Sequence, residues 1–183
     1  MNSCIKKTGG PLGGGRANRS LDEFTLATTP DHEIELAIIE YVDGKLAGCG
    51  EAQDEAGIVA SLPAGVRALY LTWTVESEVI DGGFARYFWN WAGQFAQQAV
   101  EAFEYFSAHE HARLMREANR VYAEECGTTY VSDGRELIDA YQSWRLQLLE
   151  DHFYQLDEGL SALRIARIRS NPRVFCDELV ASE

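Results

Sequence analysis

The sequence predicts an all-α fold, a single globular domain of about seven helices behind a flexible N-terminal tail. Two observations support this class. Apolar residues recur every three or four positions between residues 29 and 168, and alternation with a period of two is nowhere sustained. The only β-like run, residues 128–131, is too short to found a sheet. A chain of 183 residues, 46% of them hydrophobic, can bury a core without disulfides or metal.

Residues 1–20 are expected to form the tail, and residues 21–183 the acidic helical domain. The tail contains four basic residues, no acid and two glycine clusters, so it cannot bury enough apolar surface to offset the entropy of ordering. Its glycines are not a phosphate-binding loop, because Arg16 and Ala17 follow Gly15 where such a loop has Lys and then Ser or Thr.

The first expected helix begins at Thr29 and Pro30, an N-cap followed by a proline suited to the first turn, and ends at Gly48. Its apolar stripe is Ile34, Ile38, Tyr41, Val42 and Leu46, and its other face is acidic. A polar loop containing Glu51, Asp54 and Glu55 should follow. A second helix is expected from Leu62 and Pro63 to Gly82 and Gly83.

Five more helices complete the expected fold. A short aromatic helix spans residues 84–91 and ends at Gly93, and helices over 95–106 and 109–125 follow. Asp133 and Glu136 form a capping box before a helix whose buried stripe is Leu137, Ile138, Tyr141, Trp144, Leu148 and Leu149. The last helix covers residues 160–168 and stops at Asn171 and Pro172.

The charge balance argues against direct binding of nucleic acid. The 29 acids exceed the 16 Lys and Arg residues and leave a net charge of −13, which would repel a phosphate backbone. Four widely spaced cysteines without a CxxC pair are typical of reduced thiols, and no apolar run approaches the length of a membrane span or a signal peptide. We therefore expect a cytoplasmic protein with no membrane association.

Motifs that carry chemistry are absent from the sequence. His109 and His111 are two residues apart, so on a helix their rings point away from each other and cannot share a metal. Glu76, Glu78 and Asp81 could supply paired carboxylates, but the glycines after Asp81 favour a structural turn. We expect no catalytic residue, no metal site and no cofactor.

Residues 69–93 contain a distinctive set of side chains, namely Trp73, Glu78, Asp81, Gly82, Gly83, Phe84, Tyr87, Phe88, Asn90 and Gly93. This set resembles the Glu-Val-x-Asn-Gly-Gly-Phe signature of the DNA-mimic protein family, a DMP-like domain of unknown function. Asp81 stands where that family usually has asparagine. Two further segments, Ile38 to Leu46 and Asn171 to Phe175, are similar to the two ends of that family's domain, so the resemblance covers roughly residues 30–176.

The resemblance implies an all-α, acidic, often dimeric protein whose surface can copy duplex DNA and occupy a DNA-binding regulator. The charges on a single helix are too far apart to copy duplex DNA. Neighbouring carboxylates on a helix lie ~5–6 Å apart, whereas duplex DNA carries about one charge per 1.7 Å of its axis. Several helices or a homodimer are therefore needed. The candidate partner-binding acids, in helical register, are Glu101, Glu104, Glu117, Glu124, Asp133, Glu136, Asp139, Glu150, Asp151, Asp157 and Glu158.

Three functions remain open on these grounds, and the third is an enzyme that uses Glu76, Glu78 or Asp81. The first is a non-enzymatic binding protein that covers the DNA-binding face of a transcriptional regulator or nucleoid protein. The second is an immunity or antitoxin-like protein that neutralises a basic toxin. The aromatic residues Trp73, Phe84, Tyr87, Phe88, Trp89 and Trp91 are expected in the core, in part at a subunit interface.

Overall fold

The all-α prediction is confirmed. The computed structural model describes residues 20–47, 55–126 and 142–177, and within these ranges it contains eight α-helices, two short 3₁₀ helices and no strand. The predicted tail lies almost wholly outside the described residues. So do the β-like run, the capping box of Asp133 and Glu136, and Asp139.

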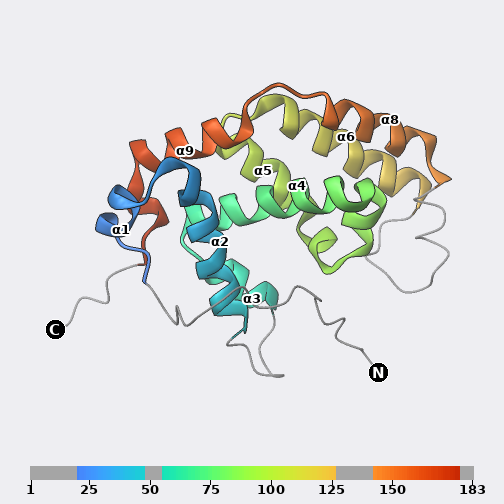
Figure 1. Cartoon of the computed structure of the whole chain (residues 1–183). Helices are drawn as coiled ribbons and strands as arrows, with labels where there is room; N and C mark the ends of the chain where they lie inside the picture. Colours follow the sequence, from blue (N-terminus) through green and yellow to red (C-terminus); the bar gives the residue numbers. More distant parts are fainter. Residues whose placement is uncertain (1–19, 48–54, 127–141, 178–183) are drawn as a thin grey trace.

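Helix α4 (Ala64–Trp89) is the centre of the molecule (Figure 1). The N-terminal helices α1 (Glu23–Thr28), α2 (Asp31–Ala47) and α3 (Glu55–Ser61) lie about its first half. The short helix η1 (Trp91–Phe95) leads from its end into α5 (Ala96–Tyr105) and α6 (His109–Glu125). Helix α8 (Trp144–Tyr154) packs on α4 and α6, whereas α9 (Leu160–Ser170) and η2 (Pro172–Phe175) return to the N-terminal helices.

Two core clusters meet along α4. One contains Phe84, Phe88 and Val79 of α4 with residues of α5, α6 and α8. The other contains Val66 and Leu69 of α4 with residues of α1, α2, α3 and η2. The long central helix thus belongs to both halves, which makes them one body.

The spacing of the apolar residues does not predict two short helices. Helix α1 has the start signal of a helix, because Asp22 accepts a hydrogen bond from the Thr25 N–H at 2.7 Å. Helix α3 begins at Glu55, where the sequence predicts a polar loop. Helices of six and seven residues show at most two turns of the apolar pattern, too few to reveal a period.

The predicted helix through residues 137–149 is wrong at its middle. Ser143 has an extended backbone and caps α8 by accepting from the Leu146 N–H, so α8 starts anew at Trp144 and runs to Tyr154. The new helix has its own phase: Leu146, Leu149 and Phe153 are buried, whereas Trp144 is 70% exposed and Leu148 46% exposed. The predicted stripe runs across this break, and its members Leu137, Ile138 and Tyr141 lie outside the described residues.

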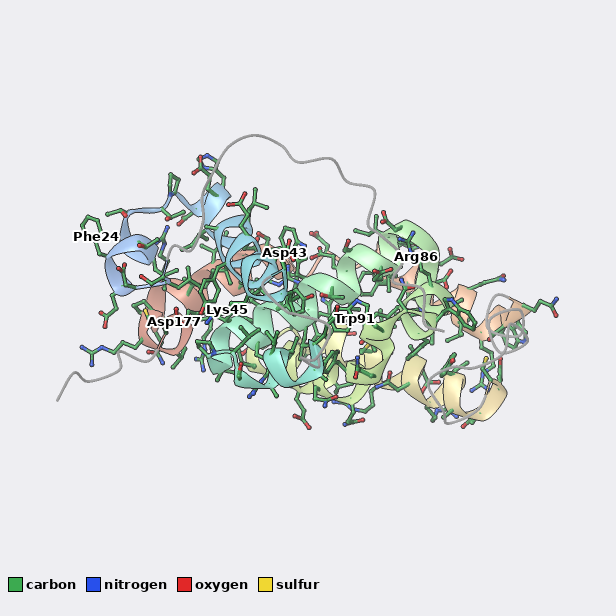
Figure 2. All side chains as sticks on the ribbon, turned by 90° about the horizontal axis from the view of Figure 1, so that it is seen from below. Phe24, Asp43, Lys45, Arg86, Trp91 and Asp177 are labelled. Carbon is green, nitrogen blue, oxygen red and sulfur yellow. The ribbon has the colours of Figure 1, made fainter. Side chains whose placement is uncertain are left out.

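The C-terminal segment is tied to α2. Asp177 pairs with Lys45 Nζ at 3.3 Å and accepts a hydrogen bond from the Tyr41 hydroxyl (Figure 2). The ring of Phe175, fully buried, lies so close to Gly65 that a Cβ there would be 2.8 Å from it. The C-terminal part of the described chain therefore packs against α2 and the start of α4.

Candidate functional site

The paired glycines interrupt the helix within α4. Gly82 (φ −170°, ψ 19°) and Gly83 (φ 76°, ψ 179°) leave helical geometry, so α4 consists of two helical segments that meet at a kink, and the second segment begins at Phe84. The helix end predicted at this glycine pair is therefore confirmed. The positive φ of Gly83 is a conformation that other residues seldom adopt.

Glu150 of α8 completes this bend. Its Oε1 accepts a hydrogen bond from the Phe84 N–H at 2.9 Å, which satisfies a backbone donor that the kink leaves free. A Cβ on Gly83 would lie 2.3 Å from the same Glu150 oxygen. Burial raises the pKa of Glu150, and the backbone hydrogen bond opposes that effect.

Polar side chains brace the two sides of the bend. Glu78, before the kink, accepts from Arg86 Nε at 2.9 Å and from Asn90 Nδ2 at 2.6 Å, both after it. Arg86, labelled in Figure 2, also lies 3.6 Å from the Asp81 carboxylate. These four side chains therefore hold the kink angle.

Aromatic residues of the motif anchor the second half of α4. Phe84, Tyr87 and Phe88 are buried, and Phe88 stacks on Tyr122 with ring centroids 4.3 Å apart. Burial also raises the pKa of the Tyr87 hydroxyl.

The other three aromatic residues expected in the core, all tryptophans, are only half-buried. Trp73, Trp89 and Trp91 keep part of their surface exposed. Gly93 passes so close to the Phe88 carbonyl that a Cβ would be 2.5 Å from its oxygen.

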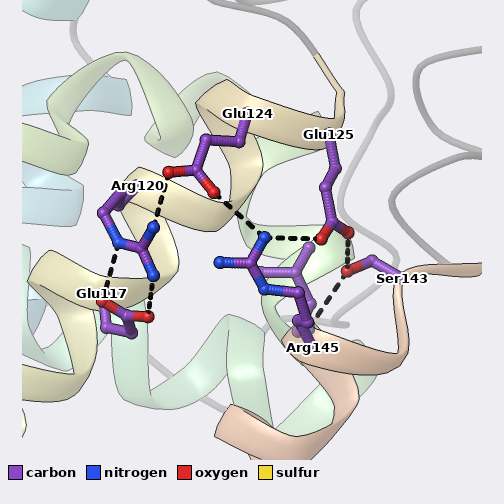
Figure 3. A network of polar contacts seen from close by, with 7 residues as sticks. Glu117, Arg120, Glu124, Glu125, Ser143 and Arg145 are labelled. Carbon is purple, nitrogen blue, oxygen red and sulfur yellow. Dashed lines mark hydrogen bonds and ion pairs between the residues drawn. The ribbon is translucent and has the colours of Figure 1, made fainter.

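The acids of α6 are largely neutralised by arginines (Figure 3). Arg120 bridges Glu117 at 2.5 Å and Glu124 at 2.5 Å, and Arg145 of α8 pairs with Glu124 at 3.0 Å and Glu125 at 2.9 Å. The hydrogen bonds from Arg120 lower the pKa of Glu117, and those from Arg145 and Arg120 lower the pKa of Glu124. On this face acidic and basic side chains alternate, and the carboxylates are paired with arginines.

Glu104 on α5 is paired in the same way. It accepts from Arg116 at 3.0 Å and contacts His109 Nδ1 at 2.9 Å, and the hydrogen bonds to His109 and Arg116 lower its pKa.

Glu158, from the loop before α9, caps a helix. It accepts from the Glu110 and His111 N–H groups at 2.9 and 3.1 Å and contacts His111 Nδ1 at 2.6 Å. Helix α6 receives no side-chain cap from its own N-cap residue, so Glu158 supplies the missing acceptor. Burial favours the neutral form of Glu158, but these hydrogen bonds outweigh it and lower its pKa.

The other candidate acids divide by their position. Glu101, Asp151 and Asp157 are exposed and have no cation partner within the described ranges. Asp133, Glu136 and Asp139 lie outside those ranges. Of the predicted stripe, then, the structure leaves three acids bare, pairs three with arginines and employs Glu150 and Glu158 in capping.

Exposed carboxylates also occur on α2 and α3, outside the predicted stripe. Glu40 and Glu55 are exposed and have no cation partner in the part of the chain that the structure describes, and Asp43 lies near them on α2. Burial raises the pKa of Tyr70, and the charges of Asp43 and Glu55 raise it further. The helical stripe of acids at the start of the sequence already indicates an acidic face on α2.

The described ranges contain no candidate metal site. No cluster of three or more His, Cys, Asp or Glu side chains there could hold a metal ion, and no helix there is both long and apolar enough to cross a membrane. Glu76 pairs with Arg164 at 2.9 Å and Glu78 with Arg86, so each carboxylate already holds a cation.

A family model described as DMP19-like protein matches residues 60–171, which is more than half of the chain. The chain belongs to the DMP19-like protein family. The DMP19-like match contains the whole bent helix with its motif, α5, α6 and α8, while the similar edge at residues 38–46 lies before it. Comparison with curated proteins and with solved structures gives no significant match.

Proposed function

We propose that this protein is a non-enzymatic DNA mimic that covers the DNA-binding face of a basic regulator. Membership of the DMP19-like family carries the proposal, because the family's name denotes DNA mimicry. The net charge of −13 is consistent with it, since attraction to a basic surface needs an excess of carboxylates.

The surface of α2, α3 and α5 is the best candidate for the partner face. It contains the exposed acids Glu40, Asp43, Glu55 and Glu101. Glu101 and residues of α3 line one cavity, and α2 contacts α3, so the three helices adjoin one another. The α6 face is a weaker candidate because its arginines would repel a basic partner.

A matched pair of variants tests this assignment. Glu40→Gln with Glu55→Gln removes two charges from the proposed face, and Asp151→Asn with Asp157→Asn removes two from α8 and the loop after it, outside that face. All four side chains are exposed and have no cation partner in the described ranges. We expect the first variant to weaken binding about 3- to 30-fold and the second to leave it unchanged.

The partner is first captured from nuclease-treated host lysate, eluted in a salt gradient and identified by mass spectrometry. Affinities of the purified partner are then measured by fluorescence anisotropy at several salt concentrations, with duplex DNA as competitor. A DNA-binding regulator that DNA displaces supports mimicry. Capture of a nuclease toxin would instead favour the antitoxin-like function. An equal loss of partner affinity in both double variants would contradict the assignment of the partner face to α2, α3 and α5.

A homodimer would join two acidic faces and raise the density of charge toward that of duplex DNA. Light scattering at micromolar concentration measures this directly, and a monomer under those conditions would show that one chain must provide the whole surface.

A further inference from the structure

A cavity of about 310 Å³ lies between α3, α4 and α5. Its wall is mainly apolar, with Val59, Ala64, Leu71 and Ala102 among the lining residues. Four polar side chains also line it: Arg67, Gln98, Glu101 and Tyr105. The volume is at the lower end of the range of small-molecule sites, which are typically apolar with a few placed polar groups.

The arginines at this cavity differ from the others. Of the ten arginines in the described ranges, eight form an ion pair with Asp or Glu, and the two that do not are Arg67 and Arg167. Arg67 lines the cavity. The Arg167 guanidinium lies 4.7 Å from the ring centroid of Tyr105, another lining residue. In so acidic a protein, two cations that have no carboxylate partner within the described ranges, one lining the cavity and one stacked on a lining residue, indicate a place for an anion.

Tyr105 provides an independent observation. Its hydroxyl is buried and has no hydrogen-bond partner among the residues that the structure describes. A buried hydroxyl without a partner is unfavourable, and a ligand that accepted its hydrogen bond would remove that cost. Arg67 donates one N–H to the Ala60 carbonyl at 2.9 Å, which fixes the guanidinium and leaves further donors for a ligand.

We infer that this cavity binds a small monocarboxylate with an apolar body. The carboxylate would accept hydrogen bonds from Arg67 and, once the Tyr105 ring turns its buried hydroxyl toward the cavity, from Tyr105, and the aliphatic wall would cover the body of the ligand. Glu101, on the same wall, disfavours a doubly charged head group such as a phosphate monoester. Glu101 also belongs to the proposed partner face, but the titration below uses the purified chain alone, so its outcome does not depend on the proposed partner.

The test is titration of the full chain with 3-phenylpropionate and hexanoate, followed by calorimetry and by two-dimensional NMR. The neutral amide 3-phenylpropionamide and the dianion phenyl phosphate are the comparison probes. We expect saturable binding of at least one acid, with the amide and the phosphate each bound at least about tenfold more weakly.

Three variants locate the site. Tyr105→Phe removes only the buried hydroxyl, so it should weaken binding of the acid about 2- to 10-fold without lowering the melting temperature of the free protein. Arg67→Gln should weaken binding about tenfold or more, whereas Arg113→Gln, an exposed and paired arginine on α6, should not change it. Ala64→Leu, at an exposed lining position, should block the cavity.

Several results would overturn the inference. They are absence of saturable binding for both acids, equal affinity for acid and amide, and equal binding by the Tyr105→Phe, Arg67→Gln and Ala64→Leu variants. A change of oligomeric state in Ala64→Leu without binding of either acid would show that a second copy of the chain occupies the cavity.

Discussion

Gly83 is a residue whose substitution the fold tolerates poorly. Its φ of 76° lies where side chains are strained, and an added Cβ would meet the Glu150 carboxylate at 2.3 Å. We predict that Gly83→Ala lowers the free energy of unfolding by about 2–4 kcal/mol, since it adds backbone strain and displaces the cap of the kink. Urea unfolding followed by circular dichroism measures this difference.

Gly44 is the matched control. It lies in the interior of α2, is exposed, and has nothing within 4 Å of an added Cβ. Gly44→Ala should therefore raise the free energy of unfolding by about 0.5–1 kcal/mol. If both variants changed stability by the same amount, the special role of Gly83 would be refuted.

At the scale of the elements, carboxylates distant in sequence cap two helices. Glu158 caps α6 and Glu150 caps the part of α4 after its bend. We predict that Glu158→Gln lowers the free energy of unfolding by about 1–2 kcal/mol at pH 7, because a charged acceptor is replaced by a neutral one.

The two caps should depend on pH in opposite ways. The folded protein lowers the pKa of Glu158, so its contribution is complete above the pKa of the unfolded chain and is lost as the pH falls through the folded value. The penalty of Glu158→Gln should thus shrink as the pH falls below the ordinary pKa of a glutamate and through the lowered pKa of Glu158. Burial raises the pKa of Glu150, so ionisation there opposes folding, and Glu150→Gln should be harmless or stabilising at pH 7 but neutral at low pH. Identical pH profiles for both variants would contradict this account.

At the scale of the whole molecule, a buried ionic cluster joins three helices. Arg164 of α9 is 1% exposed and contacts Glu35 of α2 at 3.3 Å, and Glu76 and Thr72 of α4 at 2.9 and 3.1 Å. We predict that Arg164→Met costs about 3–5 kcal/mol, because it leaves the Glu35 carboxylate largely buried without its cation.

Adding Glu35→Gln to Arg164→Met should recover part of the loss, as the unpaired charge is then gone. Arg173→Met is the surface control: that arginine pairs with Glu23 but is 82% exposed, so the change should cost less than about 1 kcal/mol. Thermal and urea unfolding of the four proteins measure these values. An Arg164→Met variant as stable as the parent would show that the cluster does not hold α9 in place.

The helical class, the acidic charge and the membership of the family followed from the sequence alone. Helix periodicity and composition are local properties, so they could be read without neighbours in space, and the glycine pair in the motif marked the bend of α4. The periodicity does not predict the short helices α1 and α3, because each contains too few turns to define a period. The break at Ser143 changes which residues of α8 face the core, and the apolar pattern does not show this break.

The tertiary structure alone decided which carboxylates are bare. Glu124 and Glu101 look alike in the sequence, yet Arg120 and Arg145 neutralise the first while the second lies exposed at a cavity. Glu150 and Glu158 meet backbone donors 66 and 47 residues away, and no helical spacing contains that information. A carboxylate's charge belongs to its residue, whereas its partner is set by long-range packing.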